Sequence, residues 1–225
     1  GNYLWAKSYG GPPGSETGSE VIVSSTGDLL VLGQTSSFGS GVKDVYLTKL
    51  DSSNGNVMWS KTSGGGKYDE GISMIEDSDG GYVIGGFTES FGAGLHDAYL
   101  LKTNATGILL WSKTLGDTDE DYGYSVVQTV DGGYMLAGET RSYGQGQDDM
   151  FLTKTDGFGN SCAINNPSSV ESTAATNVST KTLIYNNGGT TVGTPMSTVE
   201  NQSPGINANC PFAILPSEQF KVAFT

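Results

Sequence analysis

The chain has 225 residues and a formal net charge of −13, with 34 glycines. An acidic surface repels nucleic-acid phosphates, and no apolar run approaches the roughly 20 residues of a membrane-spanning helix, so composition argues against nucleic-acid binding and against a membrane span. Abundant glycine favours many short strands joined by tight turns.

The chain opens with an aromatic segment, residues 2–9 (NYLWAKSY), which is typical of a strand. Its Trp-x-Lys signature at Trp5 returns at Trp59 and Trp111, at spacings of about 54 and 52 residues. Other positions recur with the same spacing. They are Gly33, Gly86 and Gly138; Ser37, Ser90 and Ser142; and Asp44, Asp97 and Asp149. This recurrence establishes three internal repeats of about 52 residues.

Each repeat contains four segments that favour strands. In the second repeat these are NVMWSKT, GISMIEDSD, GYVIGGFTE and DAYLLKT, with the tryptophan segment first. No segment shows the 3.6-residue apolar period of a helix. Four antiparallel strands in about 50 residues is the size of a propeller blade. We therefore predict an all-β chain with three four-stranded, propeller-blade-like repeats over residues 1–160, followed by a separate tail, residues 161–225.

Residues 1–160 resemble the glycine-rich β-propeller-type repeats of secreted and surface proteins in bacteria and archaea. The matching motifs are Asp-Gly-Gly-Tyr, Gly-x-Thr-x-Ser-Phe-Gly and Asp-x-Tyr-Leu-x-Lys, and the first repeat departs from them with Gly27-Asp28. The resemblance implies an extracellular or cell-surface location and a propeller-like fold. It implies no particular activity, because such repeats serve mostly as scaffold.

The tryptophan segment is extra at the front of the array, and Ala163 takes the place of a fourth tryptophan at the back. Propellers usually close with four to eight blades, so three leave open edges that recruit other strands. The first segment either closes the last blade of its own chain or completes that of a neighbour, which generates a ring or a filament. We expect a homo-oligomer or polymer. The alternatives are a fragment of a longer protein and a monomer whose tail covers the open edge. The predicted contact residues are Tyr3, Trp5, Phe220, Val222 and Phe224.

The tail is rich in serine and threonine, with a predicted hairpin at Asn187-Gly188 and a terminal strand that alternates Phe220, Val222 and Phe224. Cys162 and Cys210 are predicted to form a disulfide, which would close a loop of roughly 50 residues and contribute about 4 kcal/mol. The alternative is two unpaired thiols.

Several residues are candidates for a site or a modification. Asp117, Asp119 and Asp121 alternate in DTDED, which suits calcium but equally suits a solvated turn, because the segment lacks the glycine and glutamate of an EF-hand. His96, the single histidine, is expected to be an exposed turn residue. Three sequons predict glycosylation, at Asn104, Asn177 and Asn201.

These patterns predict a non-catalytic extracellular structural protein without a cofactor, which self-assembles through strand exchange as a fibre or surface-layer subunit. The alternative is an extracellular adhesin or glycan-binding module, in which the recurring aromatic residues form a stacking platform for sugars. The competing interpretation of those aromatic residues is core packing between blades.

Overall fold

The computed structural model describes residues 4–144 and 147–161. In these ranges the chain forms eleven strands and no helix, and all ladders between the strands are antiparallel. The prediction of an all-β chain is confirmed. The described residues contain no helix with the length and apolar character that a bilayer crossing requires. The predicted tail hairpin and terminal strand lie outside the described residues.

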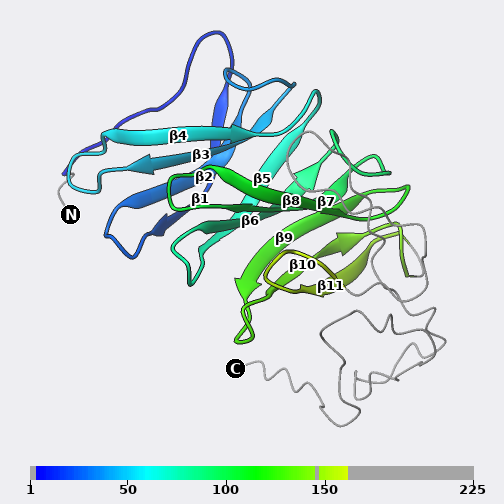
Figure 1. Cartoon of the computed structure of the whole chain (residues 1–225). Helices are drawn as coiled ribbons and strands as arrows, with labels where there is room; N and C mark the ends of the chain where they lie inside the picture. Colours follow the sequence, from blue (N-terminus) through cyan, green and yellow to red (C-terminus); the bar gives the residue numbers. More distant parts are fainter. Residues whose placement is uncertain (1–3, 145–146, 162–225) are drawn as a thin grey trace.

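The strands form three separate sheets (Figure 1). Sheet 1 contains β1 (Glu16–Val23), β2 (Leu29–Thr35), β3 (Asp44–Leu50) and β4 (Val57–Ser63). Sheet 2 contains β5 (Asp69–Glu76), β6 (Tyr82–Thr88), β7 (Asp97–Thr103) and β8 (Leu109–Leu115). Sheet 3 contains β9 (Asp121–Gln128), β10 (Tyr134–Thr140) and β11 (Asp149–Thr155). In each sheet every strand pairs with the next one along the chain.

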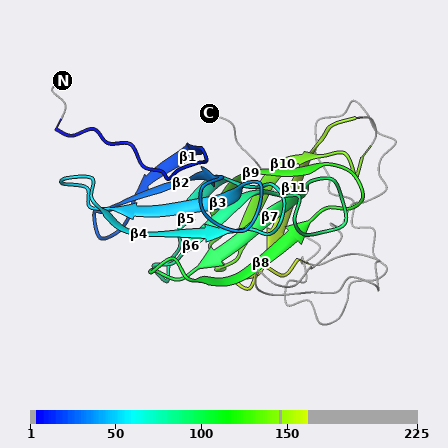
Figure 2. The ribbon, with the colours of Figure 1, turned by 90° about the horizontal axis from the view of Figure 1, so that it is seen from above.

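The sheets follow one another in chain order and pack face to face (Figures 1 and 2). β5 packs against the first three strands of sheet 1, and β9 packs against the first three strands of sheet 2. The described strands do not close into a barrel. The arrangement is therefore a row of sheets in which sheet 2 has a neighbour on each face.

The tryptophan strand ends a sheet and does not begin one, which corrects the predicted boundary between repeats. Trp59 in β4 pairs with Lys49 in β3, and Trp111 in β8 pairs with Lys102 in β7. The reason is the hydrogen bonding of the connections. Residues 51–56 close into a turn between β3 and β4, in which the backbone N–H of Asp51 donates to the carbonyl oxygen of Asn56, whereas residues 64–68 cross from β4 to the next sheet.

The N-terminal segment was predicted as a strand, but residues 4–9 form none. The segment lies instead on the turn between β3 and β4. Trp5 Nε1 donates a hydrogen bond to the carbonyl oxygen of Ser52 at 3.1 Å, and the Tyr9 hydroxyl donates one to the carbonyl oxygen of Gly55 at 2.7 Å. A ladder needs the edge of a neighbouring strand, and a turn does not offer one.

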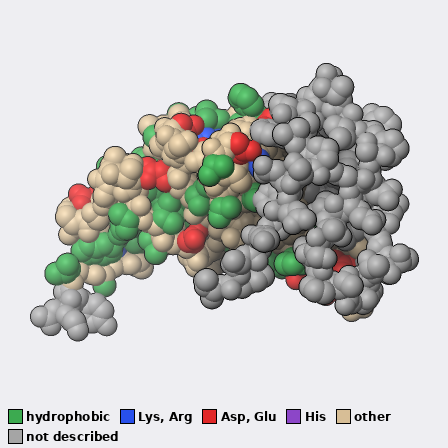
Figure 3. All heavy atoms as spheres, turned by 90° about the horizontal axis from the view of Figure 1, so that it is seen from below, with side chains coloured by type: hydrophobic (Ala, Val, Ile, Leu, Met, Phe, Trp, Pro, Cys, Tyr) green, Lys and Arg blue, Asp and Glu red, His purple; other side chains and the backbone are tan. Residues whose placement is uncertain are grey.

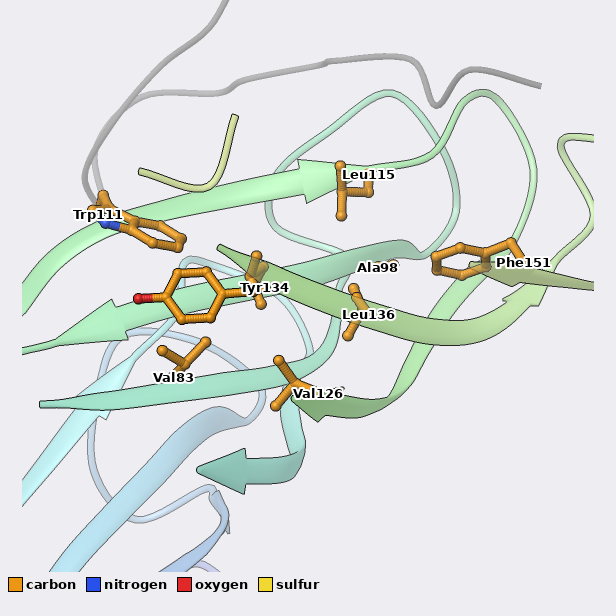
Figure 4. Packing of buried hydrophobic residues seen from close by; sticks show 9 residues of the cluster. Val83, Ala98, Trp111, Leu115, Val126, Tyr134, Leu136 and Phe151 are labelled. Atoms are coloured by element: carbon orange, nitrogen blue, oxygen red, sulfur yellow. The ribbon is translucent and has the colours of Figure 1, made fainter. Parts of the chain in front are cut away.

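Two hydrophobic clusters fill the spaces between the sheets. One joins sheets 1 and 2, and the other joins sheets 2 and 3 (Figure 4). Alternation along β6 and β7 sends side chains to opposite faces, so sheet 2 contributes to both clusters. Tyr99 and Leu101 enter the first cluster, and Ala98 and Leu100 enter the second. The seven residues of β6, like those of β7, are all buried.

The glycine inside the second strand of each sheet lies where the backbone of the first strand comes close. A Cβ at Gly86 would overlap the carbonyl oxygen of Glu70, next to the bulge in β5. Gly86→Ala is therefore expected to lower the free energy of unfolding by about 1–3 kcal/mol, measured by urea denaturation. Gly66→Ala is the control, because its Cβ meets nothing within 4 Å. Equal midpoints for the two variants would contradict this explanation.

Candidate functional site

The three tryptophans make the same contact with a glycine in a turn. A Cβ at Gly107 would lie 2.6 Å from the ring of Trp59, and one at Gly159 would lie 2.7 Å from the ring of Trp111. The distance from a Cβ at Gly55 to the ring of Trp5 is 2.8 Å. Each of these glycines has positive φ, a conformation that side chains other than glycine rarely adopt. Trp5 therefore contacts sheet 1 as Trp59 contacts sheet 2.

The lysine two residues after the tryptophan repeats a second contact. Lys7 Nζ donates a hydrogen bond to Asn56 Oδ1 at 2.6 Å, and Lys113 Nζ donates one to Asn160 Oδ1 at 3.1 Å. Both acceptors follow the turn glycine directly. Residues 4–10 therefore lie on sheet 1 in the place that the last strand of a preceding sheet would take.

Each junction between sheets contains two facing carboxylates. At the first junction, a Cβ at Gly64 would overlap Asp44 and lie 2.7 Å from Asp69 Oδ2. At the second, a Cβ at Gly116 would lie 2.6 Å from Asp97 Oδ1 and 2.5 Å from Asp121 Oδ2. All four aspartates are buried. Only glycine fits between the paired carboxylates, and glycine recurs at this position in each repeat.

Hydrogen bonds from backbone and hydroxyl groups satisfy these carboxylates. Asp121 accepts bonds from the backbone N–H of Asp117 at 3.1 Å, from Ser142 Oγ at 2.6 Å and from the Thr140 hydroxyl. Asp97 accepts one from the backbone N–H of Gly94 at 3.0 Å. The first junction repeats this pattern, with Gly65, Thr88 and Ser90 donating to Asp69, and with Ser40 and Gly41 donating to Asp44. The repeating aspartates are thus structural, as turn aspartates often are.

Burial makes the charged form of these aspartates costly. Burial, together with the negative charge of Asp121, raises the pKa of Asp97 to about 6, although a backbone N–H bond from Gly94 opposes the shift. Burial also raises the pKa of Asp44 and of Asp121. Ionisation of Asp44, Asp97 or Asp121 therefore weakens the junction at which that aspartate lies.

The lysine that ends each repeat motif forms an ion pair with the turn between the first two strands of its sheet. Lys102 Nζ lies 2.8 Å from Asp77 Oδ2 and 2.7 Å from Asp79 Oδ1, and the Tyr134 hydroxyl of sheet 3 also donates to Asp77. Burial raises the pKa of Asp77, but the hydrogen bonds from Lys102 and Tyr134 outweigh that effect and hold it at about 2. The Asp77 carboxylate therefore stays charged at neutral pH.

Two aspartates of the predicted calcium segment, Asp119 and Asp121, accept hydrogen bonds from different groups. Asp121 belongs to the second carboxylate pair, and Asp119 Oδ1 accepts a hydrogen bond from the backbone N–H of Glu120 at 3.0 Å. Within residues 4–144 and 147–161, no group of three or more histidine, cysteine or acidic residues could hold a metal ion. The calcium hypothesis for Asp117, Asp119 and Asp121 gains no support.

His96 is not the exposed turn residue that the sequence suggested. Its ring stacks on Tyr122 of the next sheet with centroids 5.0 Å apart, and its Nε2 lies 3.0 Å from Glu89 Oε1. Phe87 also contacts both rings. This row of aromatic side chains joins sheets 2 and 3. The residue is partly buried because the turn before β7 folds over the neighbouring sheet.

The other predicted site residues fall into two groups. Asn104 lies in the turn between β7 and β8, where its Oδ1 accepts hydrogen bonds from the backbone N–H groups of Thr106 and Ile108 at 3.0 Å. The remaining predictions lie outside the described residues. They are Tyr3, Phe220, Val222 and Phe224 for assembly, Asn177 and Asn201 for glycosylation, and Cys162 and Cys210 for the disulfide.

The face of sheet 1 that points away from sheet 2 exposes hydrophobic side chains. Val21 in β1 is 60 % exposed, whereas the equivalent Met74 and Val126 are each 2 % exposed under a preceding sheet. Leu29, Val31 and Tyr46 are only partly buried, although their equivalents in sheets 2 and 3 are buried. We call this surface, made of Val21, Leu29, Val31 and Tyr46, the front face.

Sheet 3 exposes the complementary surface. Met150 and Leu152 in β11 are 81 % and 61 % exposed, whereas their equivalents in sheets 1 and 2 are at most 3 % exposed under a following sheet. Those equivalents are Val45 and Leu47 in β3 and Ala98 and Leu100 in β7. We call the surface formed by Met135, Met150 and Leu152 the back face. Figure 3 shows one side of the molecule, with hydrophobic side chains exposed between acidic ones.

The two ends also carry one half each of a carboxylate pair. Glu16 begins β1 where Asp69 and Asp121 begin β5 and β9, and a Cβ at Gly10 would overlap its carboxylate. Asp149 begins β11 where Asp44 and Asp97 begin β3 and β7. In its apolar and charged positions, sheet 1 therefore matches the second sheet of an internal junction, and sheet 3 matches the first sheet of an internal junction.

No protein-family model matches this chain, and no curated protein matches its sequence. Of the predicted assembly residues, Trp5 alone lies among the described residues, and it contacts the turn between β3 and β4 of sheet 1. Sequence reasoning missed Val21, Met150 and Leu152. Alignment of the repeats against one another contains the signal, because each of these apolar residues is equivalent to a position that is apolar and buried in the other repeats.

Proposed function

We propose that this chain is a non-catalytic, extracellular structural protein whose propeller-type sheets stack head to tail with other copies, as a fibre or surface-layer subunit. One observation supports this most strongly. The front and back faces expose apolar side chains at positions whose equivalents are buried between sheets inside the same chain.

The energy available at such a junction is substantial. Full burial of a valine, leucine or methionine side chain contributes about 1.5–3 kcal/mol relative to exposure. The outer edge of β11 adds backbone groups, because within the described residues it has only one bridge, between Thr155 and Ser161. In sheets 1 and 2 the equivalent edge pairs with a fourth strand along its length. Exposed apolar faces favour association, and so does a strand edge that has no ladder among the described residues.

The symmetry of the contact follows from the two faces being different surfaces. A head-to-tail contact between unlike faces leaves one face free at each end, so it continues into a closed ring or an open filament. Both forms suit a scaffold. The acidic composition and the three sequons support an extracellular location for it.

A glycan-binding function is the alternative, and the aromatic row favours it at one point. Tyr124 is 44 % exposed and stacks on Tyr122 with centroids 6.0 Å apart and an angle of 9° between the rings. Flat exposed rings suit sugar stacking. A monomer that binds glycans through Tyr124 would support this alternative over assembly.

Light scattering of the purified full chain tests the assembly. We expect particles much larger than 23.4 kDa. Val21→Lys and Leu152→Lys are each expected to hold the chain near its monomer mass, because burial of an unpaired ammonium group at the junction is costly. Val130→Lys is the control, since Val130 is fully exposed in the turn between β9 and β10. A wild-type chain that stays at monomer mass at every concentration would refute the proposal.

A further inference from the structure

We infer that residues 4–10 of one copy form the fourth strand of sheet 3 in another copy, antiparallel to β11 and in one defined register. This inference rests on the proposed head-to-tail assembly and specifies its contact. The proposed partner of the outer edge of β11 is thus a second copy of this chain.

The register follows from the two complete sheets. Trp59 and Trp111 pair with Lys49 and Lys102, so Trp5 should pair with Lys154. In the complete sheets, Lys61 pairs with Leu47 and Lys113 pairs with Leu100. Lys7 should therefore pair with Leu152, the equivalent of those leucines. Two residues further along the same ladder, Tyr9 should pair with Met150.

The donated segment needs no rearrangement to make this contact. It already lies on sheet 1 of its own copy with the tryptophan–glycine and lysine–asparagine contacts that β8 makes with sheet 3. When the back face of another copy docks on this front face, the edge of β11 comes beside the segment. The strand would therefore extend a sheet of one copy while its side chains stay packed on the other.

The backbone and the carboxylates support the same geometry. The N–H groups of Asp69 and Asp121 donate hydrogen bonds at 2.8 Å to the carbonyl oxygens of Lys43 and His96 in the preceding sheet. By equivalence, the N–H of Glu16 would donate to the carbonyl oxygen of Asp148 in the other copy. Gly10 would then lie between Glu16 and Asp149, as Gly64 and Gly116 lie between the internal pairs.

The competing occupant is the chain's own continuation, which starts at the bridge between Thr155 and Ser161. The sequence favours the second copy. Residues 4–10 retain Trp5, Lys7 and Gly10 at the three repeat positions that make contacts. The continuation has Ala163, Asn165 and Ser168 at those positions. By equivalence, a serine side chain at the third position would overlap Asp149, as a Cβ at Gly64 or Gly116 would overlap Asp44 or Asp97.

Disulfide trapping between two singly substituted full-length chains tests the register. One chain has Lys7→Cys and the other has Leu152→Cys, with the native cysteines kept. The chains are mixed, oxidised and digested, and mass spectrometry identifies the linked peptides. We expect a link between positions 7 and 152 from different copies. The control partner is Thr153→Cys, which shifts the register by one residue and points to the opposite face of the strand.

The outcomes separate this inference from the proposed function. Large particles without the 7–152 link, or with equal linkage to position 153, would overturn the strand register and leave head-to-tail stacking intact. Wild-type chains that stay monomeric would overturn both. Circular dichroism of each variant before mixing shows whether it is folded, and Tyr9→Cys with Met150→Cys provides a second pair in the same register.

Discussion

Leu100→Ala is expected to lower the free energy of unfolding of the single chain by about 2–5 kcal/mol, whereas Leu152→Ala is expected to change it by less than about 0.5 kcal/mol. The two leucines are equivalent in the repeat. Leu100 in β7 is fully buried between sheets 2 and 3, so its removal leaves a cavity. Leu152 in β11 has no sheet over it among the described residues and is mostly exposed.

Urea denaturation at a dilution where the chain is monomeric gives both free energies. The substituted residue and its position in the repeat are the same in the two variants. The comparison also tests what covers the back face. If Leu152→Ala lowers the free energy of unfolding of the monomer as much as Leu100→Ala does, a part of the same chain covers the back face. If Leu152→Ala lowers the free energy of unfolding only at concentrations where particles form, another copy covers the back face.

Asp97→Asn is expected to stabilise the chain at neutral pH and to have little effect in acid. Burial and the charge of Asp121 raise the folded-state pKa of Asp97 from 3.8 to about 6. A group with a raised folded pKa contributes its stability below pH 3.8, and that contribution is lost as the pH rises through 6. The shift corresponds to a loss of about 3 kcal/mol between those limits. Asparagine keeps an oxygen that accepts the Gly94 N–H bond and carries no charge.

The measurement is the difference in unfolding free energy between Asp97→Asn and wild type at several pH values from 4 to 8. This difference in unfolding free energy should grow as the pH rises and become constant above pH 6. Asp131→Asn is a control of opposite sign, because hydrogen bonds from Lys154 and Thr129 lower the pKa of Asp131 to about 2. Its destabilisation should be present at neutral pH and decrease as the pH falls from 3.8 towards 2. A difference for Asp97→Asn that does not vary with pH would contradict the assignment.

The repeat made the strands predictable from sequence, because each apolar segment occurs three times between turn residues. The segment DAYLLKT coincides with β7, and NVMWSKT differs from β4 by one residue at each end. The position at which a sheet begins was predicted wrongly, because the tryptophan strand ends a sheet and does not begin one. A repeat has no intrinsic starting point, and the choice depends on which connection closes into a turn.

The junctions depend on contacts between residues that are far apart in sequence. Asp44 and Asp69 belong to different sheets, and nothing local to either residue indicates the other. His96 was misjudged for the same reason, because its stacking partner Tyr122 lies in the next sheet. The glycine between the carboxylates did leave a signal. Its recurrence at Gly10, Gly64 and Gly116 follows the tryptophan repeat.

The row arrangement has a consequence for cooperativity. Sheet 2 has two neighbours, whereas sheets 1 and 3 each have one within the described chain. In such a linear array the stability is approximately a sum of terms for each unit and each interface between neighbours. Opening of a terminal sheet breaks one interface, and opening of sheet 2 breaks two. Local unfolding is therefore expected to begin at the ends and move inward. In the proposed head-to-tail assembly, each added copy would turn a fraying end into an interior unit.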